Sequence, residues 1–391
     1  MDERKQKKSG EYGVYMVNSV VLDHGHNKMG KIMKFRHLIG ACVLGAFLFY
    51  GCEGENITEV SSVETGESLA ERVGPVSQYG RLLAGKVDGV GRIFGSCEGI
   101  AAGKEVQVRG MSMFWSATTE GTAFYNEAGI NSIVQNFKAE VVRLAIATEE
   151  NWGVPGYVKN PERQRQLIKD AVMAAVKNDI YVIIDWHSHT ATKQLEAASQ
   201  FFEEMAQEYG DYDNVIFEVF NEPKDQTWEQ IREYANKIIA VIRKYSDNLI
   251  LVGNPNYDQR PSSIIGNEVE DPKNNVAYTL HYYANTHGES LRSNGSRAMS
   301  AGLPLFVSEW GTANANGDGV PDLTKNQEWQ DWLNENKLSS ANWSITSKKE
   351  GTAAITPSSK ANAFELSESG TLVQSYLKTN PDKYTACKAK K

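Results

Sequence analysis

The sequence has no excess of positive charge. Its 391 residues include 41 Lys and Arg against 49 Asp and Glu, which gives a formal net charge of −8. Nucleic acids bind where basic residues cluster on a surface, and the acidic body of this chain offers no basic stripe of that kind. The composition therefore argues against nucleic acid as a partner.

Long hydrophobic runs are missing as well. An uncharged apolar run from Leu38 to Gly51 has 14 residues, whereas a membrane-spanning helix needs about 20. The run follows three basic residues and ends at Cys52, which is typical of an export signal. We therefore expect residues 1–52 to carry a signal or lipoprotein-type segment with Cys52 as a candidate lipidation site. The protein would then be exported, either secreted or held at the cell surface, for instance as an outer-membrane lipoprotein with a lipid anchor.

Cysteine is scarce. The chain has 4, of which Cys42 lies in the export segment and Cys52 at its end. Cys97 and Cys387 remain, and in an oxidising compartment they can pair. A disulfide between them and two unrelated free thiols are both compatible with the sequence.

From Val106 onward the chain alternates short apolar runs with amphipathic stretches. Eight runs have the composition of buried strands, and the stretches between them have apolar residues at a spacing near 3.6, which indicates helices. The expected strands are 106–111, 141–146, 181–186, 215–220, 249–253, 276–280, 305–310 and 339–344. The expected helices include 162–177, 195–209, 228–245, 326–333 and 372–377.

Eight strand-then-helix units without an internal repeat predict an α/β fold, a single (β/α)8 TIM barrel. A doubly wound open sheet is the alternative, but its Gly-rich phosphate loop after the first strand is missing. We expect Gln78–Leu83 and the Gly-rich segment 85–103 to form a short N-terminal β-hairpin that closes the barrel bottom. The polar composition of residues 53–75 predicts a flexible linker. We expect residues 76–380 to form the barrel domain and residues 381–391 to form a C-terminal tail.

Polar and aromatic side chains gather where the expected strands end, and barrels of this kind build their active sites at the carboxyl ends of the strands. Taken singly, each of these side chains is more often a cap, a hydrogen-bonded core residue or packing. As a group they are hard to assign to packing, because burying several charges costs free energy unless the charges pair. The residues are Arg143, His187, Asn221, Glu222, His281, Tyr283, Glu309 and Trp343.

Two carboxylates across a groove suit the cleavage of a glycosidic bond. One must be protonated to give a proton to the leaving oxygen, and the other must be ionised to attack the anomeric carbon, so their pKa values must be pushed apart. We expect Arg143 to hold Glu309 ionised and Tyr283 to orient it. A less polar setting is expected to raise the pKa of Glu222.

The motifs around these residues resemble those of glycoside hydrolase family 5, in particular its bacterial endo-β-1,4-glucanases (cellulases). They are FEVFNEP, FVSEWGT, VIIDWH, HYYANTHG, VVRLAIA and NWSITSKKEG, within the range from about Gly74 to Asn380. The resemblance implies retaining cleavage of β-1,4-linked glucan by double displacement, with Glu222 as acid/base and Glu309 as nucleophile. It also implies that Asn221 binds the sugar 2-hydroxyl and that the cleavage subsite is shaped by Arg143, His187, His281 and Tyr283.

Further residues are expected to bind sugar. The resemblance implies that Trp343 is a sugar platform and that Lys348 and Glu350 hydrogen-bond a sugar on the non-reducing side. Many relatives carry a His in the loop after the first strand, where this chain reads RGMSMFWS. We expect Trp115 to be the platform on that side, and His189 to belong to the substrate-binding residues.

Two other classes of function compete with a glycosidase. The pair His187 and His189 is like the His-x-His of metal-dependent hydrolases, but such a site needs the pair on the first strand and further ligands on later ones. We therefore expect no metal and no cofactor. A non-catalytic carbohydrate-binding barrel is the second alternative, and its mark would be the loss of one of the two Glu.

The polysaccharide is the open point within the enzyme class. Mannan, xyloglucan and mixed-linkage β-glucan remain alternatives to β-1,4-glucan. The segment after the barrel is too short for a carbohydrate-binding module, so soluble or amorphous glucan is expected rather than crystalline cellulose. We expect a monomer.

Overall fold

The computed structural model describes residues 72–381 and 383–388. The predictions for the export segment, for Cys52 and for most of the linker lie outside these residues and stay predictions. Among the described helices, none is long and apolar enough to cross a membrane.

Eight parallel strands close into a barrel, in which each strand is hydrogen-bonded to the next along the chain and the last to the first. Nearly all their residues are buried, which explains the continuous apolar runs, because strands of a parallel sheet are covered on both faces. The strands are β3 (Arg109–Met113), β4 (Val141–Ala147), β5 (Tyr181–His187), β6 (Val215–Glu218), β7 (Ile250–Val252), β8 (Val276–Tyr283), β9 (Leu305–Gly311) and β10 (Ser340–Ile345).

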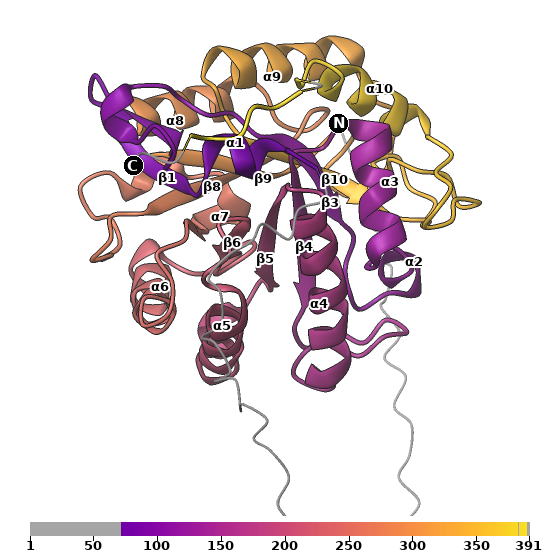
Figure 1. Cartoon of the computed structure of the whole chain (residues 1–391), viewed down its shortest axis with the longest axis horizontal. Helices are drawn as coiled ribbons and strands as arrows, with labels where there is room; N and C mark the ends of the chain where they lie inside the picture. The colour runs from indigo at the N-terminus through magenta and orange to yellow at the C-terminus, as the bar shows by residue number, and fades with distance from the viewer. Residues whose placement is uncertain (1–71, 382, 389–391) are drawn as a thin grey trace, which may run out of the picture. The chain divides into compact units, whose positions relative to one another are not determined.

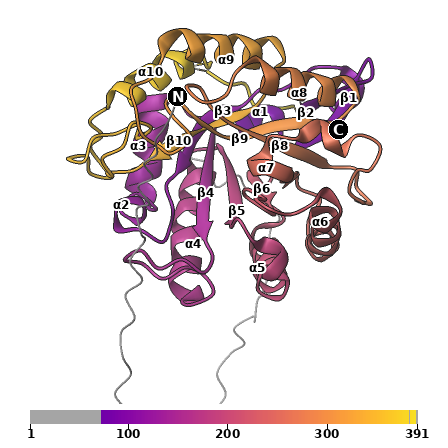
Figure 2. The ribbon, with the colours of Figure 1, turned by 180° about the vertical axis from the view of Figure 1, so that it is seen from behind.

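Helices follow the strands and surround the barrel, as Figure 1 and Figure 2 show from opposite sides. Polar side chains cap several amino ends; Thr227 and Gln230, for example, form a reciprocal capping box, which satisfies free backbone N–H groups. The helices are α1 (Pro75–Tyr79), α2 (Thr119–Thr122), α3 (Glu127–Phe137), α4 (Pro161–Lys177), α5 (Leu195–Tyr209), α6 (Trp228–Ile242), α7 (Pro255–Asp258), α8 (Glu289–Ser300), α9 (Leu323–Glu335) and α10 (Glu368–Leu377).

The (β/α)8 prediction is confirmed, and one strand was placed wrongly. The first barrel strand begins at Arg109 and not at Val106. The Val106 N–H donates to the Ile93 carbonyl, and Glu105 bridges to Phe94, so this segment pairs with the hairpin before it enters the barrel. The other seven strands begin within one residue of their predicted starts.

The hairpin covers the amino ends of the barrel strands, as predicted. It consists of β1 (Leu82–Val87) and β2 (Val90–Gly95), which pair antiparallel. Apolar side chains of the hairpin form one cluster with residues near the strand starts: Leu82, Ala84, Ile93, Val108, Val141, Tyr181, Ile183, Ile216, Leu251, Ala277 and Phe306. The opposite, carboxyl end of the barrel is left for the site.

The C-terminal segment also lies at the amino end of the barrel, next to the hairpin. Cys97, next to the hairpin, forms a disulfide with Cys387, with their Cα atoms 6.0 Å apart. The Cys387 N–H donates to the Ser77 carbonyl, and the Tyr384 hydroxyl donates to Glu140 at 2.8 Å. Both cysteines therefore lie far from the carboxyl ends of the strands.

Candidate active site

The predicted site residues gather at the carboxyl ends of the barrel strands. A cleft of about 210 Å³ is lined there by Trp115, His187, His189, Asn221, Glu222, Tyr283, Glu309, Trp343, Lys348 and Glu350, among others. Arg143 and His281 are buried and contact the cleft-lining Glu309 and Glu222 respectively. A larger hollow of about 520 Å³ beside the hairpin, at Gly85 and Pro304, contains none of the predicted residues, so volume alone does not identify the site.

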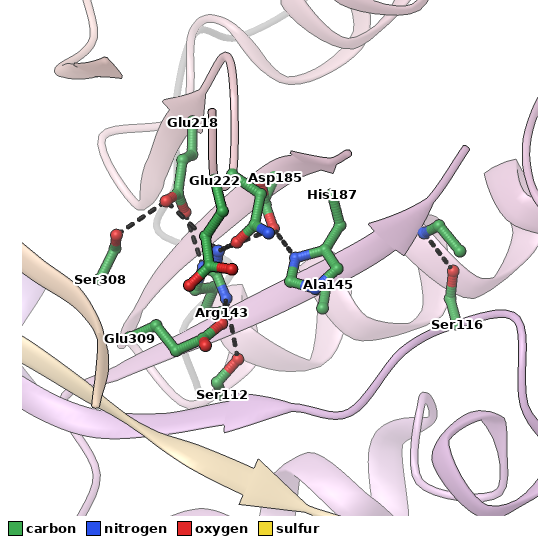
Figure 3. A network of polar contacts seen from close by, with 12 residues as sticks. Ser112, Ser116, Arg143, Ala145, Asp185, His187, Glu218, Glu222, Ser308 and Glu309 are labelled. Atoms are coloured by element: carbon green, nitrogen blue, oxygen red, sulfur yellow. Dashed lines mark hydrogen bonds and ion pairs between the residues drawn. The ribbon is translucent and has the colours of Figure 1, made fainter. Parts of the chain in front are cut away.

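Arg143 on β4 is the centre of a buried polar network (Figure 3). Its guanidinium donates to Glu309 at 2.8 Å, to Glu218 at 2.7 Å and to Asn221 at 2.6 Å, and it lies 2.9 Å from Asp185. Burial alone would lower the pKa of Arg143, but the charges of the three carboxylates outweigh it and raise the pKa well above its usual value. The guanidinium therefore stays charged and fixes these acceptors in place.

Glu309 on β9 has two donors. Arg143 holds one carboxylate oxygen, and the Tyr283 hydroxyl on β8 donates to the other at 2.7 Å. Burial and the charge of Glu222 raise the pKa of Glu309 above its usual value; the charges of His281 and Arg143 and the hydrogen bond from Tyr283 oppose this rise without cancelling it. These donors favour the ionised form, which a nucleophile needs.

Glu222 lies just after β6 and faces two histidines. His281 Nδ1 is 3.0 Å from Glu222 Oε1, and His189 Nε2 is 3.2 Å from Glu222 Oε2. Burial raises the pKa of Glu222, but the hydrogen bonds from His189 and His281 outweigh it and lower the pKa to about 2. The expectation of a raised pKa at Glu222 is therefore wrong, because the two histidines, distant in sequence, make the setting polar.

His281 on β8 carries the proton that Glu222 lacks. Its Nε2 lies 2.9 Å from the Ser308 hydroxyl, which donates to Glu218 at 2.7 Å. The single hydroxyl proton of Ser308 is used in the hydrogen bond to Glu218. The Ser308 oxygen must therefore accept a hydrogen bond from His281 Nε2–H. Burial alone would lower the pKa of His281, but the charge of Asp258 and the hydrogen bonds with Glu218 and Glu222 raise it well above its usual value. The Nδ1 proton thus points at Glu222.

His187 is held differently. Its Nδ1 lies 2.5 Å from Asp185, and burial together with the charge of Arg143 lowers the pKa of His187 well below its usual value. The ring stacks on Trp343, with centroids 5.4 Å apart and planes 6° from parallel. Trp343 is 5% exposed, so it forms part of the cleft floor.

Aromatic rings continue from this floor along one wall. Trp115 meets His187 edge-on at a centroid distance of 4.1 Å and Trp152 at 5.0 Å. Trp152 is 56% exposed and was not among the predicted residues. Its sequence surroundings, EENWG, contain no apolar pattern that would bury a Trp, and this could have marked it.

Lys348 and Glu350 form a contact of their own after β10. Lys348 Nζ lies 2.6 Å from Glu350 Oε2; the Lys348 side chain is 51% exposed and that of Glu350 5%. Lys348 also lies over the Phe114 ring, 5.3 Å from its centroid. The cation is thereby held at the cleft rim.

Several buried partners were not among the predicted site residues, although the sequence places the charges of Asp185 and Glu218 inside expected strands. Asp185 and Glu218 are neighbours in the barrel register and both contact Arg143. Ser308 and Asp258 lie beside His281. A charge inside an apolar run, as in VIIDW and VIFEV, was the available signal for the first two. Ser308 and Asp258 stand in no such pattern.

The two candidate carboxylates are close together. One oxygen of Glu222, one of Glu309 and a ring nitrogen of His281 lie within 4.8 Å of one another. These donor atoms are also near enough to share a metal ion, but the His281 ring nitrogens hold protons, and Arg143 already binds Glu309. The donor set is therefore poorly suited to a metal, and the absence of metal stays a prediction.

Comparisons with known proteins place the chain in a family. The family model described as cellulase (glycosyl hydrolase family 5) matches residues 100–349. Endoglucanase Z of Dickeya dadantii is 40% identical over 288 residues, which are 72% of this chain and 65% of that protein. Endoglucanase A of Evansella cellulosilytica is 38% identical over 290 residues, which are 71% of this chain and 57% of that protein. The chain thus matches less than two thirds of the length of both relatives.

Solved structures share the fold. The catalytic domain of alkaline cellulase K is 30% identical with a TM-score of 0.71, covering 83% of this chain and 100% of that chain. The catalytic domain of Thermobifida fusca endoglucanase Cel5A, in a variant bound to cellotetraose, is 28% identical with a TM-score of 0.67, covering 78% of this chain and 100% of that chain.

Proposed function

Because the chain belongs to glycosyl hydrolase family 5, we propose that it is an endo-acting cellulase that cleaves internal β-1,4-glucosidic bonds of cellulose or a related β-glucan with retention of configuration. The observation that carries this proposal is the approach of Glu222 and Glu309 to within 4.8 Å across the cleft. Retaining enzymes hold their two carboxyl groups about 5–5.5 Å apart, and inverting enzymes about 6.5–9.5 Å apart.

The first step forms a bond between the enzyme and the sugar. The proton on His281 Nδ1 moves across the 3.0 Å hydrogen bond to Glu222 Oε1, which leaves both groups neutral. Glu222 then gives this proton to the glycosidic oxygen while a carboxylate oxygen of Glu309 attacks the anomeric carbon. The bond between that carbon and the leaving oxygen breaks, and a glycosyl ester of Glu309 remains.

The second step releases the sugar. Glu222, now ionised, takes a proton from a water molecule, whose oxygen attacks the anomeric carbon and displaces Glu309. Arg143 and Tyr283 stabilise the carboxylate that is set free, because both donate hydrogen bonds to it. Two inversions at the same carbon give net retention.

The cleft supplies the contacts that would hold the glucan. Asn221 is fixed by Arg143 and is proposed to bind the 2-hydroxyl, with His187 and His189 beside the cleaved bond. The remaining proposed sugar contacts are Trp115, Trp343, Lys348 and Glu350, which line the same cleft. On this proposal, residues 76–380 are the catalytic domain.

A product profile tests the substrate. The purified protein is incubated with carboxymethylcellulose, barley β-glucan, xyloglucan and mannan, and viscosity and reducing ends are followed together. We expect the highest rate on one of the first two, with viscosity falling early because internal bonds break. The highest rate on mannan or xyloglucan would overturn the glucan assignment, and release from chain ends alone would overturn endo action. A parallel series with EDTA should match the untreated one.

A further inference from the structure

A strained turn lies directly after β7, beside the candidate acid. Asn256, Tyr257 and Asp258 have φ angles of 61°, 57° and 60°. A left-handed backbone costs a non-glycine residue about 1–2 kcal/mol, so the surrounding structure must hold this turn. The Tyr257 N–H donates to the carbonyl of Pro223, the residue after Glu222, and the Asp258 N–H donates to the Asn254 carbonyl.

The turn buries the Asp258 carboxylate against His281. Asp258 Oδ1 accepts the Asn254 N–H at 2.5 Å. Asp258 Oδ2 is buried without a hydrogen-bond partner among the described residues and lies 3.4 Å from His281 Nε2. A buried carboxylate oxygen without a partner is costly, and the nearest cation it faces is the imidazole.

Asp258 differs from the other carboxylates around His281 in that no second cation contacts it within residues 72–381 and 383–388. Glu218 and Glu309 are bound by Arg143, and Glu222 is also bound by His189. Burial raises the pKa of Asp258 well above its usual value, and the charge of His281 is the first influence that opposes this rise, so the ionised form of Asp258 depends on the imidazolium beside it. The charged and titratable groups that act on His281 or lie close to it are Arg143, Asp185, His187, His189, Glu218, Glu222, Asp258 and Glu309.

We propose that Asp258 is a positioning residue for the acid: from the side of His281 that faces away from Glu222, it stabilises the doubly protonated ring and so keeps a proton on Nδ1, ready for Glu222. This inference rests on the proposed function, because it assigns the source of the proton that Glu222 gives to the leaving oxygen. A single proton is transferred, first from His281 Nδ1 to Glu222 Oε1 and then from Glu222 to the glycosidic oxygen.

Asp258→Asn tests the proposal, since it keeps the shape and removes the charge. Without that charge the imidazolium is less stable, so the pair of His281 and Glu222 loses its proton at lower pH. On barley β-glucan we expect the basic limb of the kcat/KM profile to move down by about 1–2 pH units. On 2,4-dinitrophenyl β-cellobioside, whose leaving group departs without a proton, kcat/KM should stay within about twofold.

Asp225→Asn is the matched control. Asp225 lies on the same rim, three residues after Glu222, and is exposed, so water and salt screen its charge. The control variant should leave the basic limb on β-glucan where it is in the unchanged protein.

Three results would overturn the proposal. A folded Asp258→Asn protein with an unmoved basic limb would show that the charge does not act on the acid. An equal loss on both substrates would indicate a distorted cleft. If the variant does not fold, ¹⁵N NMR of the unchanged protein decides: we expect both His281 nitrogens protonated at pH 7, and a neutral ring would overturn the proposal. Failure of the proposed function itself would look different, because the unchanged protein would then hydrolyse neither substrate.

Discussion

At the scale of single residues, the two candidate catalytic carboxyl groups differ in what they touch. Glu309 is held by a guanidinium and a phenol, which cannot give up a proton at neutral pH, whereas Glu222 is held by two imidazoles, which can. Permanent donors suit a carboxylate that must stay ionised. A neighbour that exchanges protons suits a carboxyl group that must alternate between acid and base.

Tyr283→Phe should move the acid limb of the pH profile upward. The hydrogen bond from Tyr283 to Glu309 lowers the pKa of Glu309, and a hydrogen bond to a charged group is worth about 1.5–3 kcal/mol. Without it, Glu309 becomes protonated at higher pH, and we expect the acid limb of kcat/KM on β-glucan to rise by about 1–2 units.

Tyr282→Phe is the control for that experiment. Tyr282 is the neighbouring residue on β8, but its ring stacks on Trp329 and Trp310 and its hydroxyl accepts one long hydrogen bond from Gln330. It should leave the acid limb in place. A shift of the same size in both variants would mean that general loosening of β8, and not the bond to Glu309, moves the limb.

At the scale of elements, the site is made by strand ends whose loops turn inward together. The barrel register pairs His281 with Glu309 and Asp185 with Glu218, so side chains from different strands reach the same level. The loops after β3 and β4 are joined by bridges between Thr118 and the segment at Trp152. The aromatic wall is therefore built by two loops that support each other.

Trp115→Ala should weaken the binding of long substrates more than the chemistry. An aromatic contact is worth about 0.5–1.5 kcal/mol, so we expect KM on barley β-glucan to rise by about 2–10-fold while kcat changes by about twofold or less. Tyr245→Ala, an exposed aromatic after α6 that is bound to Glu203 on α5, is the control. A fall in kcat at unchanged KM would contradict the role of Trp115 as a binding platform.

Most of the elements could be predicted because each is specified locally. Runs such as YVII are apolar on both sides of the strand, and the N-terminus of helix α4 has Asn160 as its cap followed by Pro161. The start of the first strand was predicted too early because Val106 has the composition of a barrel residue, while its N–H pairs with Ile93 in the hairpin. Composition does not distinguish a residue buried in a barrel strand from one buried against the hairpin.

The candidate site was predictable in its membership but not in its electrostatics. The strand-end pattern was enough to single out Glu222 and Glu309. The low pKa of Glu222 comes from His189 and His281, and the role of Asp258 depends on a left-handed turn that no glycine marks. Such features follow from distances between residues far apart in sequence, which periodicity does not contain.

At the scale of the whole molecule, chemistry and stability are placed at opposite ends of the barrel. The carboxyl end contains the cleft, and the amino end is covered by the hairpin and the C-terminal segment, joined by the disulfide between Cys97 and Cys387. The disulfide spans 290 residues of sequence, so in the chain-entropy account it constrains most of the unfolded chain.

Cys97→Ser should lower stability and leave catalysis alone. Removing a native disulfide costs about 2–5 kcal/mol in small secreted domains, and urea unfolding should show a loss of that order. The rate on β-glucan at 25 °C should be unchanged, since the cleft lies at the other end. A reductant should destabilise the unchanged protein but not the variant; equal sensitivity of both would contradict this account.

The most direct test of the central claim is the configuration of the products that azide forms with two variants. In Glu309→Ala, azide can replace the nucleophile and should give the α-glycosyl azide from 2,4-dinitrophenyl β-cellobioside. In Glu222→Ala, Glu309 still forms the ester, and azide should displace it to give the β-glycosyl azide. ¹H NMR distinguishes the two anomers. The account predicts α from the first variant and β from the second; the reverse pattern, or near-unchanged activity of either variant on β-glucan without azide, would contradict it.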